Sequence, residues 1–303
     1  MAAAPTLPWL ITTSFVASMA SVTPQLLTPY AAQLAGPNGR GKAVGIVMLG
    51  LLGGILVSRT VSGTIAAHFG WRVVYVLAAA ATALVAIVLI RVLPRVPPTF
   101  SGSYRALMGS LTQLLREEPV VRQTSLVAAL QFAAFSAFWT TLAFHLHSLD
   151  ARYGSETAGL FGLVGVAGAS GSYAIGKLTD AHEPRRIVFV ATLVFIASYG
   201  VLAWKGESIG GLIVGVILLD LGLQSAHVSN MARNLGVRNR AMSRANTIYM
   251  TIRFAGGAAG SMLGNYAWSE WHWAGVCSVG AACACLSMVL QVVPSGNAMR
   301  AVR

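Results

Sequence analysis

Long apolar runs, separated by short polar segments, follow one another along the whole chain. Each run is close to the roughly 20 residues that a helix needs to cross the hydrocarbon core of a bilayer. The pattern predicts an all-α integral membrane protein with nine membrane-spanning helices, at residues 9–33, 42–66, 72–93, 122–146, 155–178, 186–204, 208–232, 243–267 and 273–293.

One part of this pattern occurs twice. Residues 40–72 combine a basic start, a glycine-rich apolar span and a Trp-Arg end, and their Gly53-Gly54 pair corresponds to Gly256-Gly257 in a later span. The repeat predicts two related halves, with three spans in residues 1–93 and six in residues 122–303. Glycines remove side-chain bulk and let a neighbouring helix approach closely. We therefore expect helix packing at Gly45, Gly50, Gly53, Gly54, Gly256, Gly257 and Gly260.

A linker at residues 94–121 separates the two halves. After the sequence LPRVPP, apolar residues of segment 101–117 fall on one helical face, which predicts a short amphipathic helix on the cytoplasmic membrane surface. Ser101 or Ser103 is expected to cap its beginning, because a serine side chain accepts a hydrogen bond from the first turn.

Polar and aromatic side chains line one face of several spans at helical spacing. Rings offer stacking area and an amide fixes orientation, which suits the binding of an amphiphilic organic molecule. Packing between helices would produce the same stripes, so both interpretations remain open. The candidate substrate-binding residues are Ser21, Gln25, Gln131, Phe135, Trp139, Gln224 and His227.

Two ionisable residues lie deep within predicted spans. Asp220 is near the middle of its span, where even the low insertion scales assign a cost of about 2.5–3.5 kcal/mol, so it is a functional candidate. Arg253 lies at a similar depth. The two side chains could form a structural pair, or a proton-coupling pair in which protonation of Asp220 releases Arg253, or make no contact.

Composition supports a membrane protein and explains the charge. The chain is 55% hydrophobic and 10% charged, with a mean hydropathy of +0.68, which is unusual for a water-soluble domain. The net charge of +12 reflects 21 basic residues, most of which lie in alternate connections between spans and at the C-terminus. This positive-inside bias predicts a cytoplasmic C-terminus and an outer N-terminus in the cell's inner membrane, and it leaves no basic domain for nucleic acid.

Other chemistry has little support in the sequence. The three cysteines all lie in the last span and are interpreted as packing residues, so no metal or cofactor is expected. Residues 1–8 contain no Lys or Arg, which argues against a cleaved signal peptide. We find no nucleophile elbow, phosphate loop or metal-ligand pair, so an enzyme is not expected.

Charged residues after the fifth span form a recognisable signature. Gly176, Lys177 and Asp180, followed by Arg185-Arg186, resemble the second copy of the cytoplasmic loop signature Gly-x-Leu-Ala-Asp-Arg-x-Gly-Arg-Arg of the major facilitator superfamily. The loop here is one residue longer. We interpret these charges as a clamp that holds helices together in one conformation and releases them in another, with a solvated turn as the alternative.

Residues 40–72 are similar to the fifth helix and the start of the sixth helix of this family. Its antiporter motif, Gly-x-x-x-Gly-Pro-x-x-Gly-Gly, is partly present as Gly45, Gly50, Gly53 and Gly54, and Leu49-Gly50 stands where Gly-Pro is expected. The family has twelve helices, so the resemblance implies three plus six here, with the first three helices missing. It also implies that the stripes in the first, fourth and seventh spans line one central site.

The resemblance implies a monomeric secondary transporter that moves a small organic solute by alternating access, with a proton as the coupling ion for efflux. Two alternatives remain. The first is a non-functional fragment or a miscalled gene start, because three helices of the family pattern are missing. The second is a membrane receptor or enzyme, for which a soluble signalling domain or a catalytic cluster would be expected.

Overall fold

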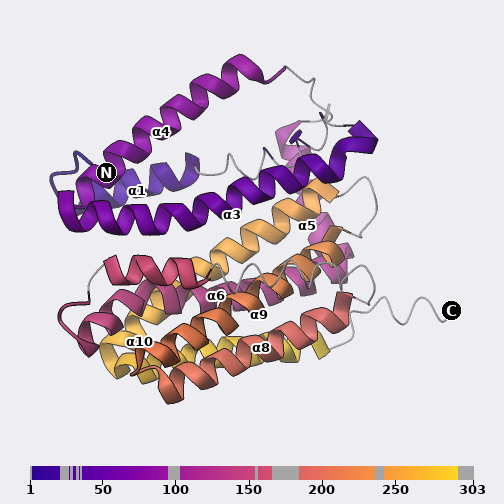
Figure 1. Cartoon of the computed structure of the whole chain (residues 1–303). Coiled ribbons are helices and arrows are strands. Elements are labelled where there is room, and N and C mark those ends of the chain that lie inside the picture. Colours follow the sequence, from indigo (N-terminus) through magenta and orange to yellow (C-terminus); the bar gives the residue numbers. More distant parts are fainter. Residues whose placement is uncertain are drawn as a thin grey trace. The chain divides into compact units, whose positions relative to one another are not determined.

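The structure is a computed structural model whose described part is helical (Figure 1). It describes residues 2–20, 27, 30–31, 34, 36–94, 103–153, 156–165, 184–235 and 242–292. Contacts divide the chain into two compact units. The first consists of Met1–Thr99 with Gly154–Leu163, and the second of Phe100–Tyr153 with Val164–Arg303. The predicted division into halves and a linker stays a prediction.

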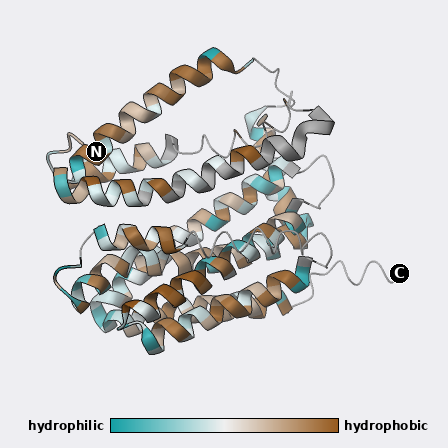
Figure 2. Ribbon diagram, viewed as in Figure 1, coloured by the Kyte–Doolittle hydropathy of each residue, from teal (hydrophilic) through white to brown (hydrophobic). Residues whose placement is uncertain are grey.

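The first unit contains the helices α1 (Leu7–Ala20), α3 (Gly36–Phe69) and α4 (Trp71–Val92). Only Gly70 separates α3 from α4, and its φ of 81° lies in the left-handed region that favours glycine. Figure 2 shows α4 as hydrophobic along most of its length, and none of its residues is buried. The apolar side chains of α4 are therefore not buried by the described residues.

The second unit has a dense core. Its helices are α5 (Tyr104–Glu117), α6 (Pro119–Leu149), α8 (Pro184–Lys205), α9 (Ile209–Leu235) and α10 (Met242–Val292). The most extensive contacts between its described helices are those of α6 with α10 and of α8 with α9. The largest fully buried side chains in it are aromatic: Tyr199, Tyr249, Phe138 and Phe195.

Five helices of the described part are long and apolar enough to cross a membrane, namely α4, α6, α8, α9 and α10. α10 contains a break at His272, where φ is 48° and ψ is −141°, and the predicted spans 243–267 and 273–293 lie on either side of it. The chain is therefore a multi-pass membrane protein. The count of nine spans and the orientation of the termini stay predictions.

The linker helix α5 begins as its sequence suggests. The backbone N–H of Ala106 donates to Ser103 Oγ at 3.2 Å, which makes Ser103 the N-cap. Three leucines of its apolar face pack against Val121, Ala245 and Ile248 of α6 and α10. Helices α6 and α10 thus cover part of the apolar face of α5, which was predicted to lie on the membrane surface.

Candidate functional site

Three aromatic side chains of α6 form what we call the aromatic row: Phe132, Phe135 and Trp139. Spacings of three and four residues place them along one side of the helix. The rings of Phe132 and Phe135 stack with centroids 5.8 Å apart, and those of Phe135 and Trp139 are 6.0 Å apart. α6 therefore presents a continuous aromatic surface inside the second unit.

Asp220 of α9 lies at the Trp139 end of the aromatic row. Its side chain is 6% exposed. A Cβ added to Gly165 would lie 2.8 Å from Asp220 Oδ2 and 3.5 Å from Trp139 Cζ2, so the carboxylate and the indole meet at this glycine. The absence of a side chain at Gly165 thus makes room for the carboxylate.

Arg253 of α10 lies at the other end of the row. Its guanidinium carbon is 4.2 Å from the centroid of the Phe132 ring, in a cation–π arrangement. Phe132 also makes an edge contact with Phe254, with centroids 5.6 Å apart. Within the described part of the chain, no ion pair joins Arg253 to Asp220. Their pairing stays a prediction. In this structure Arg253 lies at the Phe132 end of the aromatic row and Asp220 at the Trp139 end.

His227 continues the polar line of α9 and contacts α10. Its Nδ1 shares a hydrogen bond of 2.9 Å with the Tyr249 hydroxyl, and the two rings stack with centroids 5.7 Å apart. Gln224, one turn before His227, is half-buried and makes no hydrogen bond to a described residue. His227 is therefore tied to the helix that carries Arg253.

Gln131 has a different environment. It is 1% exposed, and its Nε2 donates to Thr192 Oγ1 of α8 at 2.9 Å. The Nε2 of Gln291 in α10 donates to the same oxygen at 2.8 Å. Of the two interpretations left open by the sequence, these contacts favour packing for Gln131, because its amide and that of Gln291 meet at one hydroxyl and so join α6, α8 and α10.

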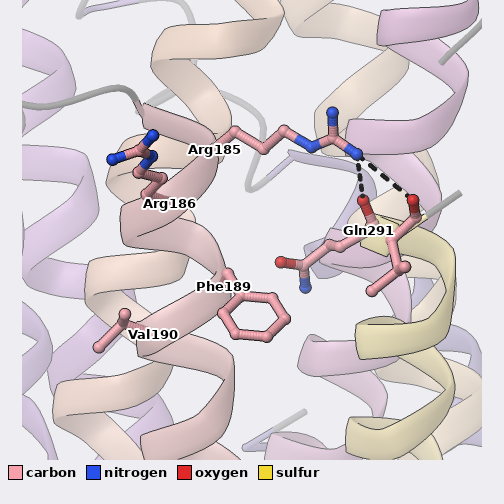
Figure 3. A pocket seen from close by; sticks show the side chains of 6 residues that line it. Arg185, Arg186, Phe189, Val190 and Gln291 are labelled. Carbon is pink, nitrogen blue, oxygen red and sulfur yellow. Dashed lines mark hydrogen bonds between the residues drawn. The ribbon is translucent and has the colours of Figure 1, made fainter. Parts of the chain in front are cut away.

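The described part of the predicted clamp consists of Arg185 and Arg186. Arg185 Nη2 donates to the carbonyl oxygens of Gln291 at 3.1 Å and Val292 at 3.4 Å, which ties the beginning of α8 to the end of α10 (Figure 3). The other predicted clamp residues, Gly176, Lys177 and Asp180, lie outside the described residues. So do two predicted substrate-binding residues, Ser21 and Gln25.

The predicted packing glycines occupy two kinds of surroundings. A Cβ on Gly256 or Gly260 would overlap the backbone of Ala129 or Ala133 in α6, and one on Gly257 would overlap the Phe132 ring. In α3, by contrast, no described atom lies within 4 Å of a Cβ built on any of three glycines: Gly50, Gly53 and Gly54. Gly45 is helical within α3.

Sequence reasoning missed four residues of this region. Tyr249 precedes Arg253 by four residues, so its place on the same helical face could have suggested it. Gly165 belongs to a glycine-rich span, but its role depends on a carboxylate from another helix. Phe132 and Thr192 carry no local signal, because their partners come from distant segments.

The helices of the second unit thus enclose a buried carboxylate and aromatic side chains. The family model described as Major Facilitator Superfamily matches residues 1–261. The chain belongs to this superfamily. The match confirms the resemblance seen in the loop signature and the glycine-rich helix.

Relatives in this superfamily are named as transporters. The chain is 36% identical over 270 residues to Uncharacterized transporter YgaY of Escherichia coli O157:H7, covering 89% of this chain and 68% of that protein. It is 34% identical over 274 residues to Probable transporter SCO4007 of Streptomyces coelicolor, covering 88% of this chain and 62% of that protein. The chain thus spans about two thirds of the length of these relatives.

A solved structure shows the same fold. It is the crystal structure of a bacterial homologue of the human lysosomal transporter Spinster, in an inward-facing and unoccupied conformation. The TM-score is 0.57 with 18% sequence identity, and the match covers 88% of this chain and 71% of that chain.

Proposed function

We propose that this chain is a secondary active transporter that moves a small organic solute across the cytoplasmic membrane by alternating access, with proton-coupled efflux as its mode. Its superfamily and the names of its relatives support transport. The observation that carries the proposal for coupling is the buried carboxylate of Asp220 beside Trp139.

The depth of Asp220 makes its charge significant. It follows the first residue of α9, Ile209, by 11 positions, and a rise of 1.5 Å per residue puts it about 17 Å along the helix. That distance is near the middle of a hydrocarbon core about 30 Å thick. Binding or release of a proton at this carboxylate would change the charge there by one unit inside the hydrocarbon core.

The surroundings of Asp220 indicate a solute class. Aromatic faces attract cations and apolar rings, and a carboxylate attracts a cation further. The proposed solute is therefore a neutral or cationic amphiphilic molecule, with Phe135 and Trp139 as its apolar surface. A proton and a cationic solute that compete for one carboxylate would be exchanged across the membrane, which is antiport.

The test uses the full chain in proteoliposomes, with ethidium as the probe and an imposed pH gradient. We expect gradient-driven ethidium movement by the wild type, and a loss of at least about tenfold in Asp220→Asn, since the amide cannot exchange a proton at neutral pH. Asp150→Asn is the matched control, because Asp150 lies in an exposed turn bonded to Arg152, and it should transport normally.

Two results would contradict the proposal. Unchanged gradient-driven transport by folded Asp220→Asn would exclude the proposal that this residue couples transport to protons. A folded wild type that moves neither ethidium nor other amphiphilic solutes would instead favour the non-functional alternative. Folding is checked by circular dichroism and by the melting temperature in detergent.

A second pair of variants tests the place of the carboxylate. Gly165→Val would push Asp220 away from Trp139, because even a Cβ would lie 2.8 Å from Oδ2. We expect reduced transport in this variant. Gly200→Val is its control, since no described atom lies within 4 Å of a Cβ there. Equal transport by both variants would show that this contact is unimportant.

The remaining residues of the proposal come from the sequence. Ser21, Gln25 and Gln224 are proposed to line the substrate path, and the clamp is proposed to include Lys177 and Asp180. The proposed orientation has the C-terminus in the cytoplasm. Cysteine accessibility from each side of the membrane would test that orientation.

A further inference from the structure

A cavity of about 530 Å³ lies between the beginning of α8 and the end of α10. We call it the α8–α10 cavity. Its lining residues are Arg185, Arg186, Phe189, Val190, Gln291 and Val292. We propose that it binds an anionic phospholipid, with the lipid phosphate at the two arginines and the upper part of an acyl chain along the apolar residues.

The chemistry of the cavity changes along α8 in the way that a lipid requires. The apolar span of this helix covers Arg185–Lys205, so the two arginines are its first residues. Phe189 and Val190 lie about one turn further into the span. Figure 3 shows the guanidinium groups at one level and these apolar side chains at another. The cavity therefore has a charged level at the membrane boundary and an apolar level below it.

Among the described residues of the second unit, its apolar wall is exposed. Phe189 is 41% exposed, Val190 58% and Val292 60%. Exposed apolar surface on a membrane-spanning helix meets hydrocarbon, so an acyl chain is its natural neighbour. A soluble anion would satisfy the arginines and leave this wall uncovered.

The guanidinium of Arg185 is already oriented. Both of its hydrogen bonds to α10 leave from Nη2, towards Gln291 and Val292. Its Nε and Nη1 make no hydrogen bond to any described residue. Since a guanidinium has five N–H donors in a fixed plane, the group retains donors for a phosphate without losing its attachment to α10.

The sign of the charge selects the lipid class. The residues that line the cavity in the described part of the chain include two cations and no carboxylate. Basic pockets between membrane helices attract anionic headgroups. The ammonium of a zwitterionic lipid would meet two guanidinium groups and be repelled, so phosphatidylglycerol is expected to bind better than phosphatidylcholine.

The experiment measures lipid binding to the purified full chain by native mass spectrometry, with phosphatidylglycerol and phosphatidylcholine as probes. We expect the double variant R185Q/R186Q to bind phosphatidylglycerol at least about tenfold more weakly than the wild type does, because two interfacial charges are removed. Arg72→Gln is the matched control. Arg72 is also an arginine at the beginning of an apolar helix, where it lies over Trp71 at 4.4 Å, and its loss should leave binding unchanged.

Two further arms keep the test independent of folding and of transport. R186Q leaves the bonds of Arg185 to α10 in place, and it should by itself weaken phosphatidylglycerol binding by a few-fold.

Glycerol 3-phosphate tests for a soluble ligand and should not displace the lipid. The proposal is overturned if the folded double variant binds phosphatidylglycerol like the wild type, if R72Q loses as much binding, or if glycerol 3-phosphate displaces the lipid. None of these readouts depends on ethidium transport.

Discussion

The two glycine-rich segments share a sequence pattern and differ in what surrounds them. In α10, Gly256 and Gly260 lie so close to α6 that a Cβ would come within 2.7 Å of Ala129 Cα or overlap the backbone of Ala133. In α3, a Cβ on Gly53 or Gly54 would meet no described atom within 4 Å. Among the described residues, close approach of a neighbouring helix is therefore seen at the α10 glycines and not at those of α3.

The two units also differ in how many of their described side chains are buried and in the hydrogen bonds between their helices. The second unit buries aromatic side chains such as Tyr199 and Tyr249, and polar bonds cross between its helices. In the first unit α4 buries no residue, and hydroxyl groups such as that of Thr82 bond to their own helix. Substitutions of the same kind are thus expected to have unequal effects in the two units.

The largest difference is expected between Gly260→Leu and Gly53→Leu. Overpacking costs about 1–3 kcal/mol and more where backbone atoms must separate, so Gly260→Leu should lower the melting temperature strongly or prevent folding. Gly53→Leu should change stability by only a few tenths of a kcal/mol. Melting followed by circular dichroism in detergent measures both, and equal losses would contradict the comparison.

The next difference involves two threonines with similar local bonds. Thr192 and Thr82 each donate to the carbonyl four residues earlier, at 2.7 Å, but Thr192 also accepts from Gln131 and Gln291. Thr192→Val leaves two buried amides without this acceptor, so a loss of about 2 kcal/mol is expected. Thr82→Val should be neutral within about 0.5 kcal/mol. Equal unfolding free energies would show that the network is unimportant.

Two histidines provide a smaller contrast. His145 stacks on Trp273 with centroids 3.7 Å apart and bonds to the Gly206 carbonyl at 2.8 Å. His68 is exposed and contacts the Thr64 carbonyl of its own helix. We expect His145→Ala to cost about 1–2 kcal/mol, because a ring contact and a buried bond are lost. His68→Ala should leave the melting temperature unchanged, and His145→Phe should recover the part that is due to stacking.

The smallest effect is expected at the exposed turn after α6. Arg152 donates to Asp150, with Nη2 and Oδ2 2.6 Å apart, and this bond holds the pKa of Asp150 below its usual value. A lowered folded-state pKa adds stability above the unfolded pKa of about 3.9, and that stability is lost as the pH falls through the folded pKa. The pair is exposed, so Asp150→Asn should melt like the wild type at pH 7.

The check is a comparison of the melting temperatures of the wild type and Asp150→Asn between pH 7 and pH 3. Any difference should shrink towards the acid end, where the wild-type carboxyl is protonated. A difference that grows on acidification would contradict the assigned sign.

Much of the fold could be predicted from the sequence, because helix formation in a membrane depends on local apolar length. The predicted spans 72–93 and 208–232 agree with α4 and α9 to within three residues at each end. Ser103 was one of two predicted caps and is the observed one. The loop signature and the glycine pattern predicted the superfamily to which the chain belongs.

The candidate site was predicted only in part. Periodicity indicated which residues share a face of one helix, and the position of Asp220 within an apolar span indicated a buried charge, as the structure shows. It could not reveal that the carboxylate meets Gly165, or that Arg253 lies over Phe132. Those contacts depend on how each helix is rotated against its neighbours, which side-chain volumes from several segments decide together.

The sequence by itself determined that this chain crosses the membrane several times and belongs to a transporter superfamily, because apolar length and loop signatures are local properties. The tertiary structure decided which side chains meet. It separated Gln131, bonded to Thr192 between helices, from Trp139, which lies beside the carboxylate. It also brought Arg185 against the end of α10, where two arginines and an open apolar wall form one cavity. Such contacts join residues far apart in the chain, and only packing brings them together.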